Sequence, residues 1–230
     1  MSRSTTRLRP LVALKAMRAV LRNAEDTRQV FIATRALRGR SGERTFRRFA
    51  ASPVGVQVLA ERRSLLARLS DQAALASAPP RSLAHAYCAF MAEEDLSAVG
   101  LAYASNVAEV ADLPPDALLF RDRLRDVHDL FHVLTGYGRD PLGELCVLAV
   151  TYTQTRNAGL LLIVVLGGLR IVRTSGRWDV VAALREALRR GRRTEWLPGQ
   201  DWEALLDRPL DQVRQELGVV AGRRYRPLAG

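Results

Sequence analysis

The sequence predicts an all-α protein, folded as one helical domain over residues 1–230. Apolar residues make up 48% of the chain, which is enough for one substantial core. Aromatic residues make up only 6%, whereas a β-sandwich usually contains more aromatic and β-branched side chains. Apolar positions recur at the helical period through most of the sequence, and no repeat or linker divides it.

The N-terminal segment is rich in arginine and carries no acidic residue before Glu25. We expect residues 1–9 to be disordered and an amphipathic helix to begin at about Pro10. An arginine-rich stretch without acids is also typical of a mitochondrial transit peptide. The helix is favoured because its apolar face can join the core, with Leu11, Leu14, Met17 and Leu21 on one side.

Caps and breakers divide the rest of the chain. Residues 39–52 have the composition of an irregular stretch, and Pro79 and Pro80 interrupt the chain further on. Helices are predicted over residues 26–39, 54–71, 81–94, 97–110 and 116–137, then from Pro141 onward, over 175–196, and as a pair within 201–220.

The formal net charge of +11 predicts an anionic partner. Zinc-finger spacing, an RNA-binding aromatic strand and a helix-turn-helix signature are all missing, so we expect an anionic membrane surface and no nucleic acid. The apolar stretch Ala158–Leu169 is shorter than the roughly 20 residues that a membrane span needs. We therefore expect a buried helix or the wall of an apolar cavity there. Cys88 and Cys146 are far apart in sequence, which indicates a reduced, intracellular compartment.

Two of the three histidines, His128 and His132, are four residues apart in "HDLFHVLTGYGRDPLGE". Four residues on a helix bring side chains onto one face, so both imidazoles can bind one ion. Glu144 follows a turn containing Gly138 and Pro141, and it can return to the histidines if the two helices pack antiparallel. Two imidazoles and a carboxylate suit a divalent metal, with zinc first and iron or cobalt as alternatives.

Asp129 lies about 100° around the helix from His128, which leaves two roles open. It is either a fourth ligand or a proton acceptor beside the metal. A further alternative is that the histidines line a polar seam and bind no ion.

"HDLFH", followed by eleven residues and Glu144, resembles the signature of the coenzyme Q biosynthesis protein 4 family. "PPRSLAHAYCAFM" and "DWEALLDRPLDQVRQELGV" resemble two other elements of that family, although Ala84 and His85 depart from the first of them. The resemblance covers most of residues 10–220. After Glu144 the chain lacks the pattern of mitochondrial members, which favours a bacterial branch.

The resemblance implies a metal site made of His128, Asp129, His132 and Glu144, with Asp129 as the catalytic proton acceptor if it does not bind the metal. It also implies peripheral attachment to the membrane where ubiquinone is made, on the cytoplasmic face or, in a eukaryote, the matrix side. The implied activity is metal-dependent oxidative decarboxylation of a prenylated hydroxybenzoate, in which a hydroxyl replaces the ring carboxylate. The alternative is a non-catalytic lipid-binding scaffold with a structural metal, which organises the other ubiquinone-biosynthesis proteins.

Substrate binding is expected to involve a charged head-group site and an apolar groove for the prenyl tail. The candidates for the head group are Arg123, Arg125, Tyr152, Gln154 and Arg156. Each of these arginines can equally be a solvated or ion-paired charge. The candidate groove linings are residues 82–91, 100–107 and 158–169, and we expect a homo-oligomer.

Overall fold

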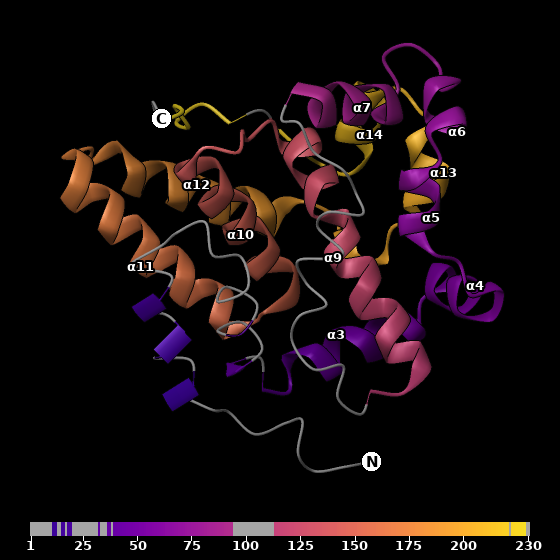
Figure 1. Ribbon diagram of the computed structural model, residues 1–230, viewed down its shortest axis with the longest axis horizontal. Coiled ribbons are helices and arrows are strands. Elements are labelled where there is room, and N and C mark those ends of the chain that lie inside the picture. Colours follow the sequence, from indigo (N-terminus) through magenta and orange to yellow (C-terminus); the bar gives the residue numbers. More distant parts are fainter. Residues whose placement is uncertain are drawn as a thin grey trace.

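The computed structural model describes residues 39–93, 113–220 and 222–228, with a few isolated positions between 11 and 37. Within these residues the protein is all helical, apart from one isolated β-bridge between Ser82 and Pro209 (Figure 1). The predicted fold class is therefore confirmed. The predictions for residues 1–10 and 97–110 lie outside the described residues.

The first half of the described chain consists of short helices. They are α3 (Ser41–Ala50), α4 (Pro53–Glu61), α5 (Leu65–Ser70), α6 (Gln72–Ala76) and α7 (Leu83–Glu93). The second half begins with four longer helices. They are α9 (Pro115–Thr135), α10 (Pro141–Thr155), α11 (Ala158–Ser175) and α12 (Asp179–Arg193), followed by η1 (Leu197–Gly199), α13 (Trp202–Leu206) and α14 (Leu210–Glu216).

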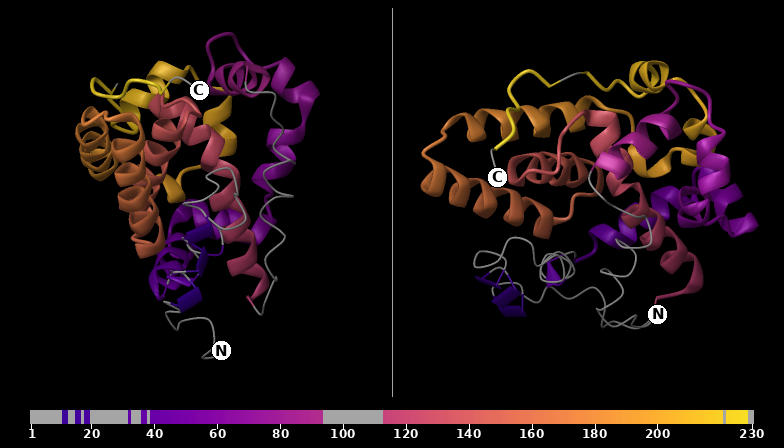
Figure 2. Two further views of the ribbon diagram at one scale, coloured as in Figure 1. Left: turned by 60° about the vertical axis from the view of Figure 1, so that its left-hand side comes forward. Right: turned by 45° about the horizontal axis from the view of Figure 1, so that its top comes forward.

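Helix α10 lies at the centre of the main core, between α11 and α12 (Figure 2). It is apolar on most of its circumference, as expected of a helix covered on several sides. Glycines on both neighbours allow close approach. A Cβ on Gly191 of α12 would lie 3.0 Å from the Cα of Val150, and one on Gly167 of α11 would lie 2.8 Å from Leu145.

Two predictions in the first half were wrong. Residues 41–50 form α3 rather than an irregular stretch, because Ser41, Thr45 and Phe49 follow each other at four-residue spacing and are all buried. Of these three residues only Phe49 is apolar, so the helical pattern of apolar positions is weak here. The single helix expected over 54–71 is broken at Arg62, whose φ of 55° ends α4, before α5 restarts.

Helix α11 is longer than the twelve-residue apolar stretch on which its prediction rested. It runs for 18 residues with a mean hydropathy of 1.7, so by length and composition alone it could cross a membrane. Core helices of soluble proteins pass the same test, but only 39% of this helix is buried. Its outer side includes Val165 and Leu169, which are 55% and 47% exposed.

Two hollows of about 510 and 530 Å³ lie on the described surface. Arginines of α12 and Arg224 line the first, whereas arginines of the C-terminal segment and two acids of α12, Asp179 and Glu186, line the second. No apolar groove is found among the described residues. The expected prenyl groove therefore stays a prediction, and residues 100–107, one of its candidate linings, are outside the described ranges.

Candidate metal centre

The segment from His128 to Glu144 spans the end of α9 and the start of α10. Gly136, at φ 73°, ends α9, and its N–H donates to the carbonyl of His132 at 2.8 Å. Asp140 caps α10 by accepting from the N–H groups of Leu142 and Gly143 at 3.1 and 3.4 Å. The short turn between these caps returns Glu144, in the first turn of α10, to the histidines.

The three predicted ligand side chains converge. The Nε2 atoms of His128 and His132 are 3.2 Å apart, and they lie 3.3 and 3.5 Å from Oε2 of Glu144. Donor atoms around a tetrahedral zinc ion, at about 2.0–2.1 Å from it, are roughly 3.3 Å from one another. The spacing and the donor types therefore fit a divalent metal held by His128, His132 and Glu144.

The orientation of His132 also suits a metal ligand. Its Nδ1 lies 2.9 Å from the carbonyl oxygen of Tyr137, which can only accept a hydrogen bond. Nδ1 therefore carries the proton, and the lone pair of Nε2 faces the site. Phe90 of α7 stacks on the imidazole with ring centroids 5.5 Å apart, which further fixes its orientation.

The charges of the group favour an ionised Glu144. Burial alone would raise the pKa of this carboxyl, but hydrogen bonds and charge from His128 and His132 outweigh burial and hold the pKa well below its usual range. Burial opposes charge on His128 as well, yet Glu144 raises the pKa of this imidazole above its ordinary value. Glu144 thus stabilises a positive charge beside the histidines, and a proton on His128 is sufficient to provide that charge.

Asp129 lies outside the three-ligand group, although it is adjacent to His128 in sequence. It is 6% exposed, and burial raises its pKa despite the opposing charges of His128, His132 and Arg139. A buried carboxyl with a raised pKa is a candidate for proton transfer. Its predicted roles as ligand or proton acceptor stay predictions.

The family model of the coenzyme Q (ubiquinone) biosynthesis protein Coq4 matches residues 5–222. The chain belongs to this family. It is 31% identical over 174 residues to the mitochondrial COQ4 homolog 1 of Culex quinquefasciatus, covering 75% of this chain and 60% of that protein. It is 28% identical over 168 residues to the mitochondrial COQ4 homolog of Bos taurus, covering 73% and 62%.

A crystal structure of a Nostoc punctiforme protein, named for a role in ubiquinone biosynthesis, has the same fold. The TM-score is 0.67 at 20% identity, and the match covers 93% of this chain and 99% of that chain. The chain spans about 60% of the Culex homologue's length. These relatives include animals and a cyanobacterium, so the branch of the Coq4 family stays a prediction.

Two of the arginines predicted to bind a head group form ion pairs with acidic residues of this Coq4-family chain. Arg123 is 2% exposed and holds Glu203 of α13 through two contacts of 2.5 Å. Arg125 contacts Asp126 at 2.7 Å and Asp122 at 3.4 Å. The structure thus gives Arg123 a role in joining α9 to α13, and its role in substrate binding has no support from its surroundings.

Tyr152, Gln154 and Arg156 are at the opposite end of α10 from Glu144. Ten residues of helix separate Gln154 from Glu144, a distance of roughly 15 Å. Gln154 is buried, donating to the carbonyl of Gly191 at 2.6 Å and accepting from the N–H of Leu197 at 3.0 Å. Arg156 is an exposed cap residue. The structure does not bring these three residues to the metal centre.

Arg139 is the charged residue that sequence reasoning missed. Its Nε lies 3.4 Å from Oε1 of Glu144, on the side of the carboxylate away from the histidines, and its side chain is 37% exposed. The signal was its place in the turn between the two ligand-bearing helices. Arginine recognises carboxylates through paired N–H donors, so Arg139 is suited to an anionic ligand at the open side of the site.

The C-terminal segment braces the same turn. The hydroxyl of Tyr225 donates to Oδ2 of Asp140 and accepts from the N–H of Gly138 at 3.0 Å. The N–H of Leu228 donates to Oδ1 of Asp140 at 3.0 Å. Because Asp140 caps the helix that carries Glu144, the tail helps to position the ligand carboxylate.

Tyr225→Phe is expected to weaken divalent metal binding about tenfold, because supporting partners of ligands typically contribute 10–100-fold. The phenyl ring keeps its contact with Tyr137, whose ring centroid lies 5.2 Å away, so the fold should hold. Competition with a chromogenic chelator measures the metal affinity. A variant with wild-type affinity would show that the tail does not position the site.

Gly143→Ala is expected to lower both stability and metal affinity. Its Cβ would lie 1.9 Å from the carbonyl oxygen of Gly138, so the turn and the start of α10 must separate. Such overpacking costs about 1–3 kcal/mol or more. Gly167→Ala is the control, because its Cβ would meet only the flexible Leu145 side chain. Urea unfolding and metal titration should separate the variants, and equal losses would contradict this account.

Proposed function

We propose that this Coq4-family protein is a metal-dependent enzyme of ubiquinone biosynthesis. Its reaction would replace the ring carboxylate of a prenylated hydroxybenzoate with a hydroxyl group. One observation carries the proposal: three donor atoms from His128, His132 and Glu144 cluster at a partly exposed position, and no fourth protein donor joins them among the described residues. Catalytic metal sites typically have three protein ligands and an open position, whereas structural sites are closed.

The residues around the site have separate roles in this proposal. His128, His132 and Glu144 hold the ion, and Arg139 binds the substrate carboxylate from the open side. A bound divalent metal supplies Lewis-acid polarisation of the phenolate and carboxylate oxygens. Asp129 is the group that accepts a proton from the ring hydroxyl.

The reaction breaks the bond between the ring and the carboxylate carbon, which leaves as carbon dioxide. One atom of dioxygen forms the new ring C–O bond, and two electrons from a reductant convert the other atom to water. Because zinc does not change oxidation state, iron or cobalt suits direct oxygen activation better. Zinc suits the scaffold reading, in which the protein presents the prenylated precursor to other enzymes and its metal is structural.

The wider setting of the protein is part of the same proposal. We propose that the protein acts at the inner face of the cell membrane, or on the matrix side in a eukaryote. Its partners there would be a prenylated ubiquinone precursor, other ubiquinone-biosynthesis proteins and further copies of its own chain. Relatives such as the bovine homologue are mitochondrial.

The test begins with anaerobic purification and metal analysis. Wild type and His128→Ala are then incubated with a prenylated hydroxybenzoate, dioxygen and a reductant, and the products are resolved by mass spectrometry. Conversion to the decarboxylated hydroquinone by the wild type alone supports the enzyme. Metal-loaded wild type that binds the lipid but does not convert it, with zinc, iron or cobalt, would overturn the enzyme in favour of the scaffold.

A further inference from the structure

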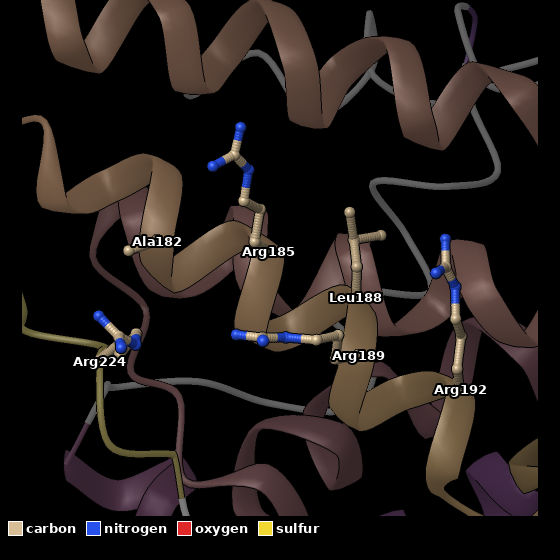
Figure 3. A pocket seen from close by; sticks show the side chains of 6 residues that line it. All are labelled: Ala182, Arg185, Leu188, Arg189, Arg192 and Arg224. Carbon is tan, nitrogen blue, oxygen red and sulfur yellow. The ribbon is translucent and has the colours of Figure 1, made fainter.

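Arginines without acidic partners surround two adjoining hollows beside α12. The first hollow, of about 510 Å³, is lined by four arginines and by no acid (Figure 3). The second, of about 530 Å³, shares Ala182 and Arg224 with the first and adds two more arginines. Within the described part of the chain, none of these six guanidinium groups forms an ion pair. They belong to Arg185, Arg189, Arg192, Arg223, Arg224 and Arg226.

Helix α12 presents a row of arginines outward because its other side is packed. Arg185, Arg189 and Arg192 follow each other at spacings of four and three residues, which places them on one face of the helix. The opposite face is buried and consists of Val180, Ala183, Leu184, Ala187 and Gly191. Arg190 turns inward instead, and its Nη2 donates to the carbonyl of Thr135 at 3.0 Å. The three arginines of the row are left exposed.

The C-terminal segment is held beside this row by contacts to its backbone. Oε2 of Glu186 accepts from the N–H groups of Arg223 and Arg224 at 3.0 and 2.9 Å. Arg177 donates to the carbonyl oxygens of residues 226 and 227 at 3.1 and 3.0 Å. Because these contacts use the backbone, they fix the position of the segment while its arginine side chains stay available to a ligand.

The first hollow brings like charges together. Figure 3 shows the side chain of Arg189 extending from α12 toward Arg224, so two guanidinium groups face the same space. The nearby acids are already engaged: Asp179 pairs with Arg177 at 2.6 Å, and Glu186 accepts from the backbone N–H groups. Clustered like charges destabilise a compact fold. Arrangements that oppose stability are expected at functional sites, and an anion in the hollow would relieve this one.

We propose that the first hollow binds a chain of phosphate groups, either inorganic triphosphate or the triphosphate of a nucleotide. Guanidinium groups bind phosphate oxygens through paired N–H donors. A triphosphate carries several negative charges on adjacent groups, which matches several arginines around one hollow. The volume lies within the range of small-molecule sites. None of the three metal-ligand candidates lines this hollow, so the site is additional to the proposed activity.

The second hollow distinguishes the two sources of the triphosphate. Asp179 and Glu186 line it, and carboxylate oxygens can accept hydrogen bonds from the hydroxyl groups of ribose. Because the two hollows share Arg224, a nucleotide can place its phosphates in the first and its sugar in the second. Inorganic triphosphate would occupy the first hollow alone.

Two other anions fit the first hollow less well. An acidic protein segment carries one carboxylate on each of several separate side chains, whereas Arg189 and Arg224 are directed to one place (Figure 3). A phospholipid needs apolar side chains for its acyl chains. Leu188 is the only large apolar residue among those that line the hollow.

Isothermal titration calorimetry on the full chain, freed of metal and kept at low salt, tests the proposal. Inorganic triphosphate should bind at least about tenfold more tightly than orthophosphate, because it reaches more than one arginine. Arg189→Gln with Arg224→Gln should weaken triphosphate binding about 100-fold, at roughly tenfold for each charged hydrogen-bond partner. Absence of triphosphate binding, or equal affinity for orthophosphate, would overturn the proposal.

Two controls separate this site from net charge and from the metal centre. Arg44→Gln with Arg81→Gln removes the same charge from exposed positions on α3 and just before α7, and should leave the affinity nearly unchanged. Arg139→Gln, beside Glu144, should do the same. Equal losses in the two double variants, or a loss in the Arg139 variant alone, would contradict the proposal. Because the protein is metal-free, either result leaves the proposed activity to its own test.

The choice of ligand identifies the source of the phosphates. Equal affinity for triphosphate and ATP would assign the phosphate chain alone, and tighter binding of ATP would assign a nucleotide. Asp179→Asn should then weaken ATP binding but not triphosphate binding. A glutamate peptide, or vesicles containing phosphatidylglycerol, that bound more tightly than triphosphate and lost this advantage in the Arg189/Arg224 variant would overturn the proposal in favour of a protein or a membrane.

Discussion

His132→Ala is expected to lower the affinity for a divalent metal by more than about 100-fold, since it removes one of three ligands while even supporting partners contribute 10–100-fold. The imidazole is fully buried and held by Tyr137 on one side, so no neighbouring histidine can replace it. Metal titration monitored by calorimetry measures the change.

The chain provides its own control for this result. His85 is the third histidine, and it is exposed on α7, so His85→Ala should keep the wild-type affinity. Because His132→Ala also removes buried volume, Glu144→Gln provides a second variant of nearly unchanged size. Metal affinity that survives both His132→Ala and Glu144→Gln would place the metal elsewhere.

Arg123→Met is expected to destabilise the fold by about 3–5 kcal/mol. Breaking a buried ion pair leaves the partner charge without compensation, and Glu203 is only 15% exposed. The change also removes a donor to the carbonyl of Gln200, 3.2 Å from the guanidinium. Urea denaturation followed by circular dichroism gives the free energy of unfolding.

Arg62→Met is the matched comparison, because Arg62 pairs with Asp116 while both side chains are 54% exposed. Exposed pairs contribute roughly 0–1 kcal/mol, so its loss should be small. Similar losses for the two variants would mean that the Arg123–Glu203 pair does not link α9 to α13. Full activity of a folded Arg123→Met protein would further separate its structural role from substrate binding.

The convergence of His128, His132 and Glu144 was predictable because its information is local. His128 and His132 share one helix, and Glu144 follows after a turn marked by glycine and proline. Helical periodicity and the breakers fixed both elements. The closure of the turn then needed only the caps at Gly136 and Asp140, which the sequence also signals.

The supporting contacts were not predictable because their partners are distant in sequence. Tyr225 reaches Asp140 across 85 positions, and Arg123 meets Glu203 across 80. No periodicity connects such pairs. Arginine looks the same in sequence whether it is buried or exposed, so Arg123 was expected near a substrate. Gln154 was misplaced for the same reason: its buried hydrogen bonds depend on how α12 and η1 pack.

X-ray absorption spectroscopy of the wild type loaded with one equivalent of zinc tests the central claim most directly. The account predicts nitrogen and oxygen scatterers only, at about 2.0–2.2 Å, with the multiple-scattering pattern of two imidazoles. Sulfur at about 2.3 Å would place the metal on Cys88 or Cys146. That result, or zinc bound without any imidazole, would contradict a centre built from His128, His132 and Glu144.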